Sequence, residues 1–204
     1  MKPQDFKIIL WDFDGVIINS NSVREAGFRD VLSEYPKEQV EKLIDYHNIN
    51  GGLSRYVKFR YFFEEIRKES ITDDMVLVLA QKFSIIMKEL LVNPDLLISP
   101  VVEFIKEQYN LGKKMHIVSG SDGNELRELC KSLRLDHFFI SINGSPTPKT
   151  SLVKNIIENG YLSLSEYCLI GDAINDYDAS KDNSIKFFGY NNLKLKNLDS
   201  YFEI

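Results

Sequence analysis

Short runs of apolar residues, most of them ending at a small or acidic residue, recur along this chain and constrain its fold more than any other feature. They cover residues 7–12, 115–119, 138–142, 167–171 and 185–189. Runs that lack a polar face are typical of strands in a parallel sheet that helices cover on both sides. Helix signals separate several of them, such as Ser99-Pro100 at a helix start and Gly112 at its end. The alternation predicts an α/β fold with a doubly wound, Rossmann-like parallel sheet.

Residues 19–91 interrupt this alternation, because they contain no convincing strand. Their apolar spacing predicts helices near residues 23–33, 37–46, 54–68 and 74–91. An all-helical block inserted after the first strand predicts a second, smaller domain. We therefore expect an α/β core formed by residues 1–18 and 92–204, and a helical domain formed by residues 19–91.

Polar and charged side chains stand where the predicted strands end or where a helix begins. They are Asp12, Asp14, Ser119, Lys149 and Asp172. In open α/β sheets, ligands bind beyond the carboxyl ends of the strands, so we expect these side chains at one rim. Three crowded carboxylates repel one another, and a hard divalent cation relieves that repulsion.

In their order along the chain, these motifs resemble the haloacid dehalogenase superfamily, in its phosphatase and phosphomutase branch. The matching stretches are Asp12-Phe13-Asp14-Gly15-Val16, Ser119-Gly120-Ser121, Lys149 and Gly171-Asp172-Ala173-Ile174-Asn175-Asp176. An Asp-x-Asp pair alone is a weak signal, whereas four ordered motifs at strand ends and helix starts are a strong one. The helical insertion stands where this superfamily places a cap of the helical, C1 type.

The resemblance implies a phosphomonoester hydrolase that acts through an aspartyl-phosphate intermediate. Asp12 is implied as the nucleophile, and Asp14 as the acid that protonates the leaving group and the base that activates water. Ser119, Gly120 and Lys149 are implied as ligands of the transferring phosphoryl group. The implied substrate is a small phosphorylated metabolite, with sugar phosphates among the candidates.

The same resemblance implies a Mg²⁺ cofactor. Asp12, the backbone carbonyl of Asp14 and the side chain of Asp172 are the implied ligands. Asp176 is implied to orient the metal's waters or Lys149. Mg²⁺ typically takes one or two carboxylates together with phosphate oxygens, which agrees with this set.

Substrate choice is expected to reside in the helical insertion. The stretch 50–55, Asn-Gly-Gly-Leu-Ser-Arg, resembles the substrate-facing loop of sugar-phosphate members with helical caps. Arg55 and Lys58 are then implied to contact a second anionic group or sugar hydroxyls. The alternative is a helix start at Ser54 with a solvated arginine. His47, just before the loop, more often serves packing.

Two other functions remain open. A phosphosugar mutase similar to β-phosphoglucomutase would use the same intermediate, but such mutases often carry an acid before the metal-binding aspartate, where this chain has Gly171. A non-catalytic binding module is disfavoured, because every position that the chemistry needs is filled. At single positions, a plain turn at residues 12–15 and a solvated Lys149 are the alternatives.

Charge and cysteine content indicate the setting. The net charge of -5 provides no basic surface for nucleic acid. Cys130 and Cys168 are the two cysteines and lie far apart, which favours a reduced intracellular protein. The N-terminus lacks the pattern of a signal peptide, and no apolar run reaches membrane-spanning length. We expect a cytoplasmic protein without membrane contact; the sequence says little about its oligomeric state, and a monomer is favoured.

Overall fold

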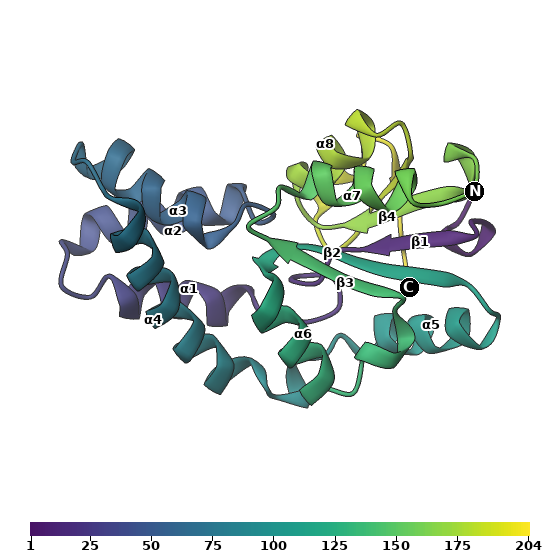
Figure 1. Cartoon of the computed structure of the whole chain (residues 1–204), viewed down its shortest axis with the longest axis horizontal. Coiled ribbons are helices and arrows are strands. Elements are labelled where there is room, and N and C mark those ends of the chain that lie inside the picture. The colour runs from purple at the N-terminus through teal and green to yellow at the C-terminus, as the bar shows by residue number, and fades with distance from the viewer.

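A six-stranded parallel sheet forms the centre of the computed structural model, which describes residues 1–204 (Figure 1). Its strands are β1 (Ile8–Trp11), β2 (Lys114–Asp122), β3 (Ser141–Ser145), β4 (Tyr167–Gly171), β5 (Lys186–Gly189) and β6 (Ser200–Tyr201). They lie side by side in the order β3-β2-β1-β4-β5-β6, and all neighbours are parallel. The predicted α/β fold with a doubly wound parallel sheet is therefore confirmed.

Both faces of the sheet are covered by helices, as the apolar runs predicted. Alternate side chains of a strand point to opposite faces. In β1, Ile9 and Trp11 belong to the apolar cluster that includes α5 (Ser99–Asn110) and α6 (Gly123–Ser132). Ile8 and Leu10 belong to the cluster that includes α7 (Lys149–Glu158) and α8 (Ile174–Asp182). Figure 1 shows these two pairs of helices on opposite sides of the sheet.

The remaining long helices pack on one another beside the sheet and form what we call the helical cap, residues 19–91 (left side of Figure 1). They are α1 (Asn21–Val31), α2 (Lys37–Ile49), α3 (Arg55–Tyr61), the π-helical turn η2 (Phe62–Arg67) and α4 (Asp73–Leu91). Buried aromatic rings, among them Phe28, Phe59 and Phe83, fill the space between these helices. The domain boundaries themselves stay a prediction.

The two chain segments that link the helical cap to the core run antiparallel and are joined by backbone hydrogen bonds. The backbone N–H of Asn19 donates to the carbonyl of Leu96 at 2.7 Å, and that of Ile98 donates to the carbonyl of Ile17 at 2.9 Å. The chain thus leaves the sheet and returns to it side by side. This arrangement places the α1 end of the cap directly over the residues that follow β1.

Three details of the sequence prediction were wrong. The third strand was predicted at residues 138–142 but runs from Ser141 to Ser145, after a 3₁₀ turn. It lies at the sheet edge and is half-buried, so polar residues are tolerated there and an apolar run does not mark it. The strand β6 was not predicted, and the predicted helix 54–68 divides into α3 and η2.

Five short 3₁₀ turns lie outside the longer helices and strands. The 3₁₀ turns are η1 (Pro3–Asp5), η3 (Pro94–Leu96), η4 (Asp136–Phe138), η5 (Leu164–Glu166) and η6 (Leu193–Leu195). Cys130 and Cys168 are buried and form no disulfide. None of the helices combines the length and the hydrophobicity that crossing a membrane requires.

Candidate active site

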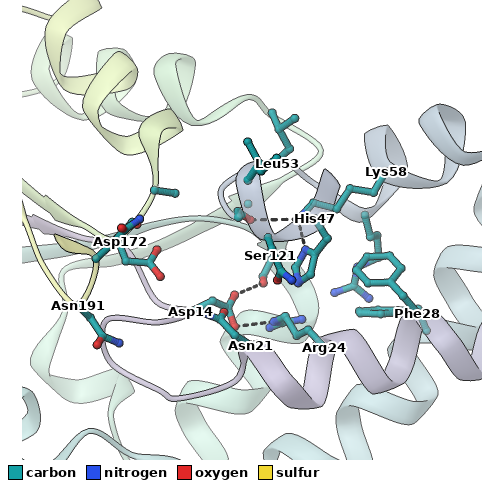
Figure 2. Close-up of a pocket in the computed structure, with 18 residues that line it drawn as sticks. Asp14, Asn21, Arg24, Phe28, His47, Leu53, Lys58, Ser121, Asp172 and Asn191 are labelled. Atoms are coloured by element: carbon teal, nitrogen blue, oxygen red, sulfur yellow. Dashed lines mark hydrogen bonds and ion pairs between the residues drawn. The ribbon is translucent and has the colours of Figure 1, made fainter. Parts of the chain in front are cut away.

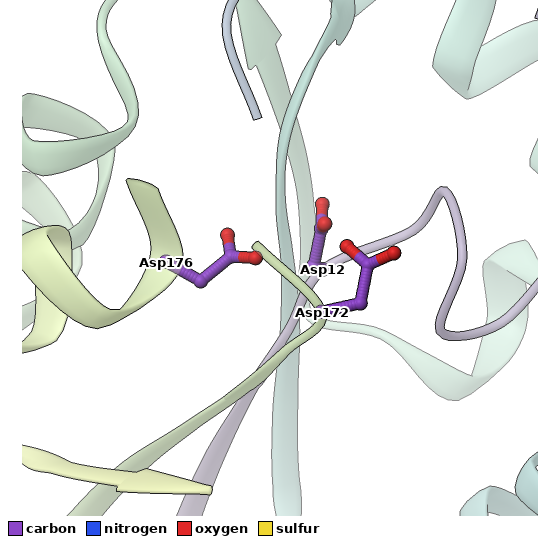
Figure 3. Close-up of side chains that lie close together, drawn as sticks. All are labelled: Asp12, Asp172 and Asp176. Atoms are coloured by element: carbon purple, nitrogen blue, oxygen red, sulfur yellow. The ribbon is translucent and has the colours of Figure 1, made fainter. Parts of the chain in front are cut away.

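Three carboxylates meet at the carboxyl end of the central strands (Figure 3). Asp12 directly follows β1, Asp172 directly follows β4, and Asp176 lies in the first turn of α8. One oxygen from each lies within 4.8 Å of the others. The parallel register of β1 and β4 brings the first two together, because Trp11 lies opposite Ile170. The structure thus assembles three of the predicted site residues.

Lys149 joins this group from the first residue of α7. Its Nζ lies 2.8 Å from Oδ1 of Asp12 and also donates to Asp176. Asp176 accepts a further hydrogen bond of 3.0 Å from the backbone N–H of Ala173, which fixes the carboxylate in place. Lys149, Asp12 and Asp176 are all buried. The alternative that Lys149 is a solvated surface lysine is therefore wrong.

The electrostatics of the cluster favour a bound cation. Burial, followed by the charge of Asp176, raises the pKa of Asp12 well above its usual value, although Lys149 opposes the shift. The same two causes raise the pKa of Asp172 to about 7. A divalent cation beside these oxygens would favour their ionised forms. The donor set, which consists of carboxylate oxygens alone, fits a hard ion such as Mg²⁺.

Asp14 turns its side chain away from the three-carboxylate cluster. Its carboxylate accepts from Nε of Arg24 at 2.5 Å, from Oγ of Ser121 at 2.6 Å and from Oγ of Ser20. Burial alone would raise the pKa of Asp14, but the charge and the hydrogen bonds of these neighbours outweigh burial and lower the pKa to about 2. Asp14 is thus held as a carboxylate, and its backbone carbonyl remains the atom predicted to meet the metal.

Two glycines allow a close approach at this rim. Gly15 has φ of +76°, and a Cβ there would fall 1.9 Å from Oδ2 of Asp172. Gly120, predicted to bind phosphate, lies so close to residues 50–55 of the helical cap that a Cβ at Gly120 would fall 2.3 Å from the carbonyl oxygen of Gly52. Ser119, the other predicted phosphate ligand, is buried, and its Oγ accepts from the backbone N–H of Ser121 at 3.1 Å. The cap is therefore seated directly on the candidate site.

A cavity of about 250 Å³ lies between the helical cap and the sheet (Figure 2). Asp14, Asp172 and Ser121 line it from the sheet side, and Arg24, His47 and Lys58 line it from the cap side. The wall is mostly polar, with Phe28 and Phe83 among its few apolar residues. Sequence motifs did not indicate Arg24, because its partner Asp14 stands ten positions away on another element.

Arg55 lines this cavity but is not solvated, so the alternative of a solvated arginine is wrong. Its Nη1 and Nη2 donate to the two oxygens of Glu125 at 2.8 and 2.7 Å, and Nη1 also donates to Oγ of Ser84 at 2.7 Å. Glu125 belongs to α6, so this bidentate pair joins the cap to the core. The role of Arg55 toward a substrate stays a prediction.

Replacing Arg55 by alanine is expected to lower the free energy of unfolding by about 3 kcal/mol, because the substitution leaves Glu125 charged and nearly buried without its main partner. Urea denaturation of the wild-type and variant proteins measures the change. Arg60→Ala is the control, since its pair with Glu64 is far more exposed and is worth about 1 kcal/mol or less. Equal, small losses in both variants would show that the Arg55 pair does not stabilise the protein.

Comparison with known proteins agrees with this geometry. The family model of haloacid dehalogenase-like hydrolases matches residues 9–190. A search of curated proteins found no significant match. The structure of a predicted phosphatase from Clostridium acetobutylicum superposes with a TM-score of 0.75 at 14% sequence identity, covering 97% of this chain and 92% of that one.

Two further solved structures share the fold. A variant of CbbY from Rhodobacter sphaeroides, in complex with xylulose-(1,5)bisphosphate, has a TM-score of 0.73 at 12% identity, covering 91% of this chain and 86% of that one. YfnB from Bacillus subtilis, bound to magnesium, has a TM-score of 0.71 at 15% identity, covering 97% and 94%. The family match includes the helical cap, every motif described above and nearly all of strands β1 to β5, so the chain belongs to the haloacid dehalogenase-like hydrolases.

Proposed function

We propose that the chain is a Mg²⁺-dependent phosphatase that hydrolyses a small phosphorylated metabolite through an aspartyl-phosphate on Asp12. The observation that carries this proposal is the group of three buried side chains, Asp12, Lys149 and Asp176, with the half-buried Asp172 beside them at the end of the central strands. It combines a nucleophile, a fixed cation and metal-ligand oxygens. The family match supports a hydrolase of this kind.

In the first step, an oxygen of Asp12 attacks phosphorus, and the bond from phosphorus to the ester oxygen breaks. The product is a mixed anhydride on Asp12 and a free alcohol. In the second step, water attacks the same phosphorus, which releases inorganic phosphate and restores the carboxylate. Two displacements replace one difficult hydrolysis. Lys149, held by Asp12 and Asp176, is placed to balance the charge of the phosphoryl oxygens.

Asp14 is the proposed proton carrier. Its carboxylate, kept ionised by Arg24 and Ser121, is in the form that takes a proton from the attacking water. Protonation of the leaving oxygen in the first step requires Asp14 in its acid form. This part of the proposed role of Asp14 rests on the resemblance to the haloacid dehalogenase superfamily. Ser119 and Gly120 are the proposed phosphoryl ligands beside it.

Asp12, Asp172 and the backbone carbonyl of Asp14 would hold Mg²⁺. Asp176 is already committed to Lys149 and to the N–H of Ala173, so its proposed role is to position Lys149. When bound, the ion offsets negative charge on the transferring phosphoryl group. The high pKa of Asp172 in the absence of a cation supports this assignment.

The substrate is proposed to enter the cavity under the helical cap, which we propose to be of the C1 type with boundaries at residues 19 and 91. The volume of about 250 Å³ suits a small metabolite. Phosphorylated metabolites are supported by the ligand of CbbY, a sugar bisphosphate. A cytoplasmic location and a monomeric state remain proposals that rest on the sequence.

The test is a panel of small phosphomonoesters, incubated with the purified chain and Mg²⁺ while inorganic phosphate is measured. We expect phosphate release from at least one class of metabolite. A sugar phosphate that is isomerised without release of phosphate would identify a mutase instead. No reaction with any phosphomonoester would contradict the proposed function.

A further inference from the structure

The cap side of the cavity contains a buried ammonium group that the chemistry at Asp12 does not use. Lys58 is 3% exposed and lines the cavity. Its Nζ donates to Nδ1 of His47 at 2.8 Å and to the carbonyl of Gly51 at 3.1 Å. None of the ion pairs in the structure includes Lys58. A buried charge without a counter-ion is unfavourable, so this position calls for an anion.

His47 does not supply that anion. Burial, followed by the charges of Lys58 and Arg24, lowers the pKa of His47 to about 3, so the ring is neutral and offers Nδ1 as an acceptor. Burial and the charge of Arg24 also lower the pKa of Lys58 to about 7. An anionic group beside the ammonium would oppose both effects.

Arg24 has unused hydrogen-bonding capacity beside Lys58. Its Nε is bound to Asp14, and its Nη1 lies 3.5 Å from Glu125. Its Nη2 is buried and has no hydrogen-bond partner. Arg55 differs, because Glu125 and Ser84 occupy its guanidinium. Among the cationic side chains that line the cavity from the cap, Lys58 and Arg24 are therefore the ones that lack a complete set of acidic partners (Figure 2).

We propose that Lys58 and Nη2 of Arg24 bind a second anionic group of the substrate, a carboxylate or a second phosphate on the leaving-group side. This inference rests on the proposed phosphatase function. Phe28 and Phe83 form apolar walls beside these donors, and the ammonium of Lys58 lies 6.0 Å from the ring centroid of Phe28. A low-dielectric wall strengthens the attraction for an anion. Arg55 instead holds the helical cap on the core through its ion pair with Glu125.

The competing explanation is structural, since Lys58 also holds the loop at Gly51 in place. A purely structural lysine would change binding of all ligands by the same factor. A lysine that contacts a second anion changes the ratio between ligands that carry this anion and ligands that lack it. The experiment therefore measures a ratio.

The probes are alkylphosphonates of increasing chain length, in which a carbon–phosphorus bond replaces the ester bond so that no turnover occurs. Each length is prepared with a methyl, a carboxylate or a second phosphonate group at the far end. Calorimetric titration in the presence of Mg²⁺ gives the Kd of each. At the best length, we expect the wild-type protein to bind an anionic end about ten- to a hundredfold more tightly than the methyl end.

Lys58→Met keeps the length of the side chain and removes its charge, and we expect it to remove most of this preference. Lys58→Gln is a second neutral variant in case the first does not fold, and Lys58→Arg should retain the preference. Lys82→Met is the matched control, because Lys82 is an exposed lysine on α4 of the same cap. It should keep the full preference.

The anionic end that binds more tightly identifies the source of the charge, a carboxylate or a second phosphate. The inference is overturned if the wild-type protein shows no preference at any length, or if the neutral variants keep it. Phosphate release from the corresponding phosphate esters is measured in parallel. Failure of all of these esters to react would contradict the proposed function, while the binding ratio would still decide the role of Lys58.

Discussion

Asp12→Asn is expected to lower the rate of phosphate release by roughly three orders of magnitude or more. The amide has nearly the size of the carboxylate but is a poor nucleophile, so the covalent step cannot proceed. The substitution also removes the charge that lies 2.8 Å from Nζ of Lys149. Steady-state phosphate release by both proteins, with the best substrate of the panel, measures the loss.

Two controls separate chemistry from folding. Asp182→Asn makes the same change at an exposed position on α8 and should leave the rate unchanged. Circular dichroism should show that Asp12→Asn is folded, because its Lys149 keeps Asp176 as a partner. If Asp12→Asn retained a tenth of the wild-type rate, Asp12 would not be the nucleophile.

Removal of divalent ions is expected to reduce phosphate release by about a hundredfold or more, and Mg²⁺ should restore it. Oxygens of Asp12, Asp172 and Asp176 lie within 4.8 Å of one another, and burial and mutual repulsion raise the pKa values of Asp12 and Asp172, so that loss of the cation disfavours their ionised forms. The ionised form of Asp12 is the nucleophile, so a change that disfavours this form slows the attack on phosphorus. Dialysis against a chelator, followed by titration with Mg²⁺, measures the dependence.

Ca²⁺ should not replace Mg²⁺ and should inhibit the loaded enzyme. It is larger and prefers more ligands, so it would draw both oxygens of Asp12 into coordination and leave none free to attack. Asp172→Asn is the matched variant and should require a higher Mg²⁺ concentration for half-maximal activity. Full turnover in excess chelator would rule out the metal assignment.

The central strands were predictable because they are buried on both faces. Ile8, Ile9, Leu10 and Trp11 are all buried, so an unbroken apolar run marks β1. At the sheet edge this signal fails. The edge strand Ser141–Ser145 is half-buried and contains polar residues such as Asn143, whose side chain donates a hydrogen bond to the carbonyl of Ile117. In the sequence, such polar residues are typical of a loop, so the strand was not predicted at its full length.

The candidate site was partly predictable for a related reason. Asp12, Lys149, Asp172 and Asp176 stand at strand ends or helix starts, and topology alone brings them to one rim. Side-chain contacts between the helical cap and the core could not be predicted, because no sequence motif marks their partners. The pair of Arg55 with Glu125 joins residues seventy positions apart, and the contacts of Arg24 with Asp14 and Glu125 likewise join the cap to the core.

The most direct test of the covalent mechanism is to trap the acyl phosphate. The protein is quenched during turnover with its best substrate and reduced with borohydride, which converts an aspartyl-phosphate to homoserine. Peptide mass analysis then locates the modified residue. We expect homoserine at position 12, in an amount that depends on substrate and Mg²⁺. Rapid phosphate release with an unmodified Asp12, or with the modification at another aspartate, would contradict it.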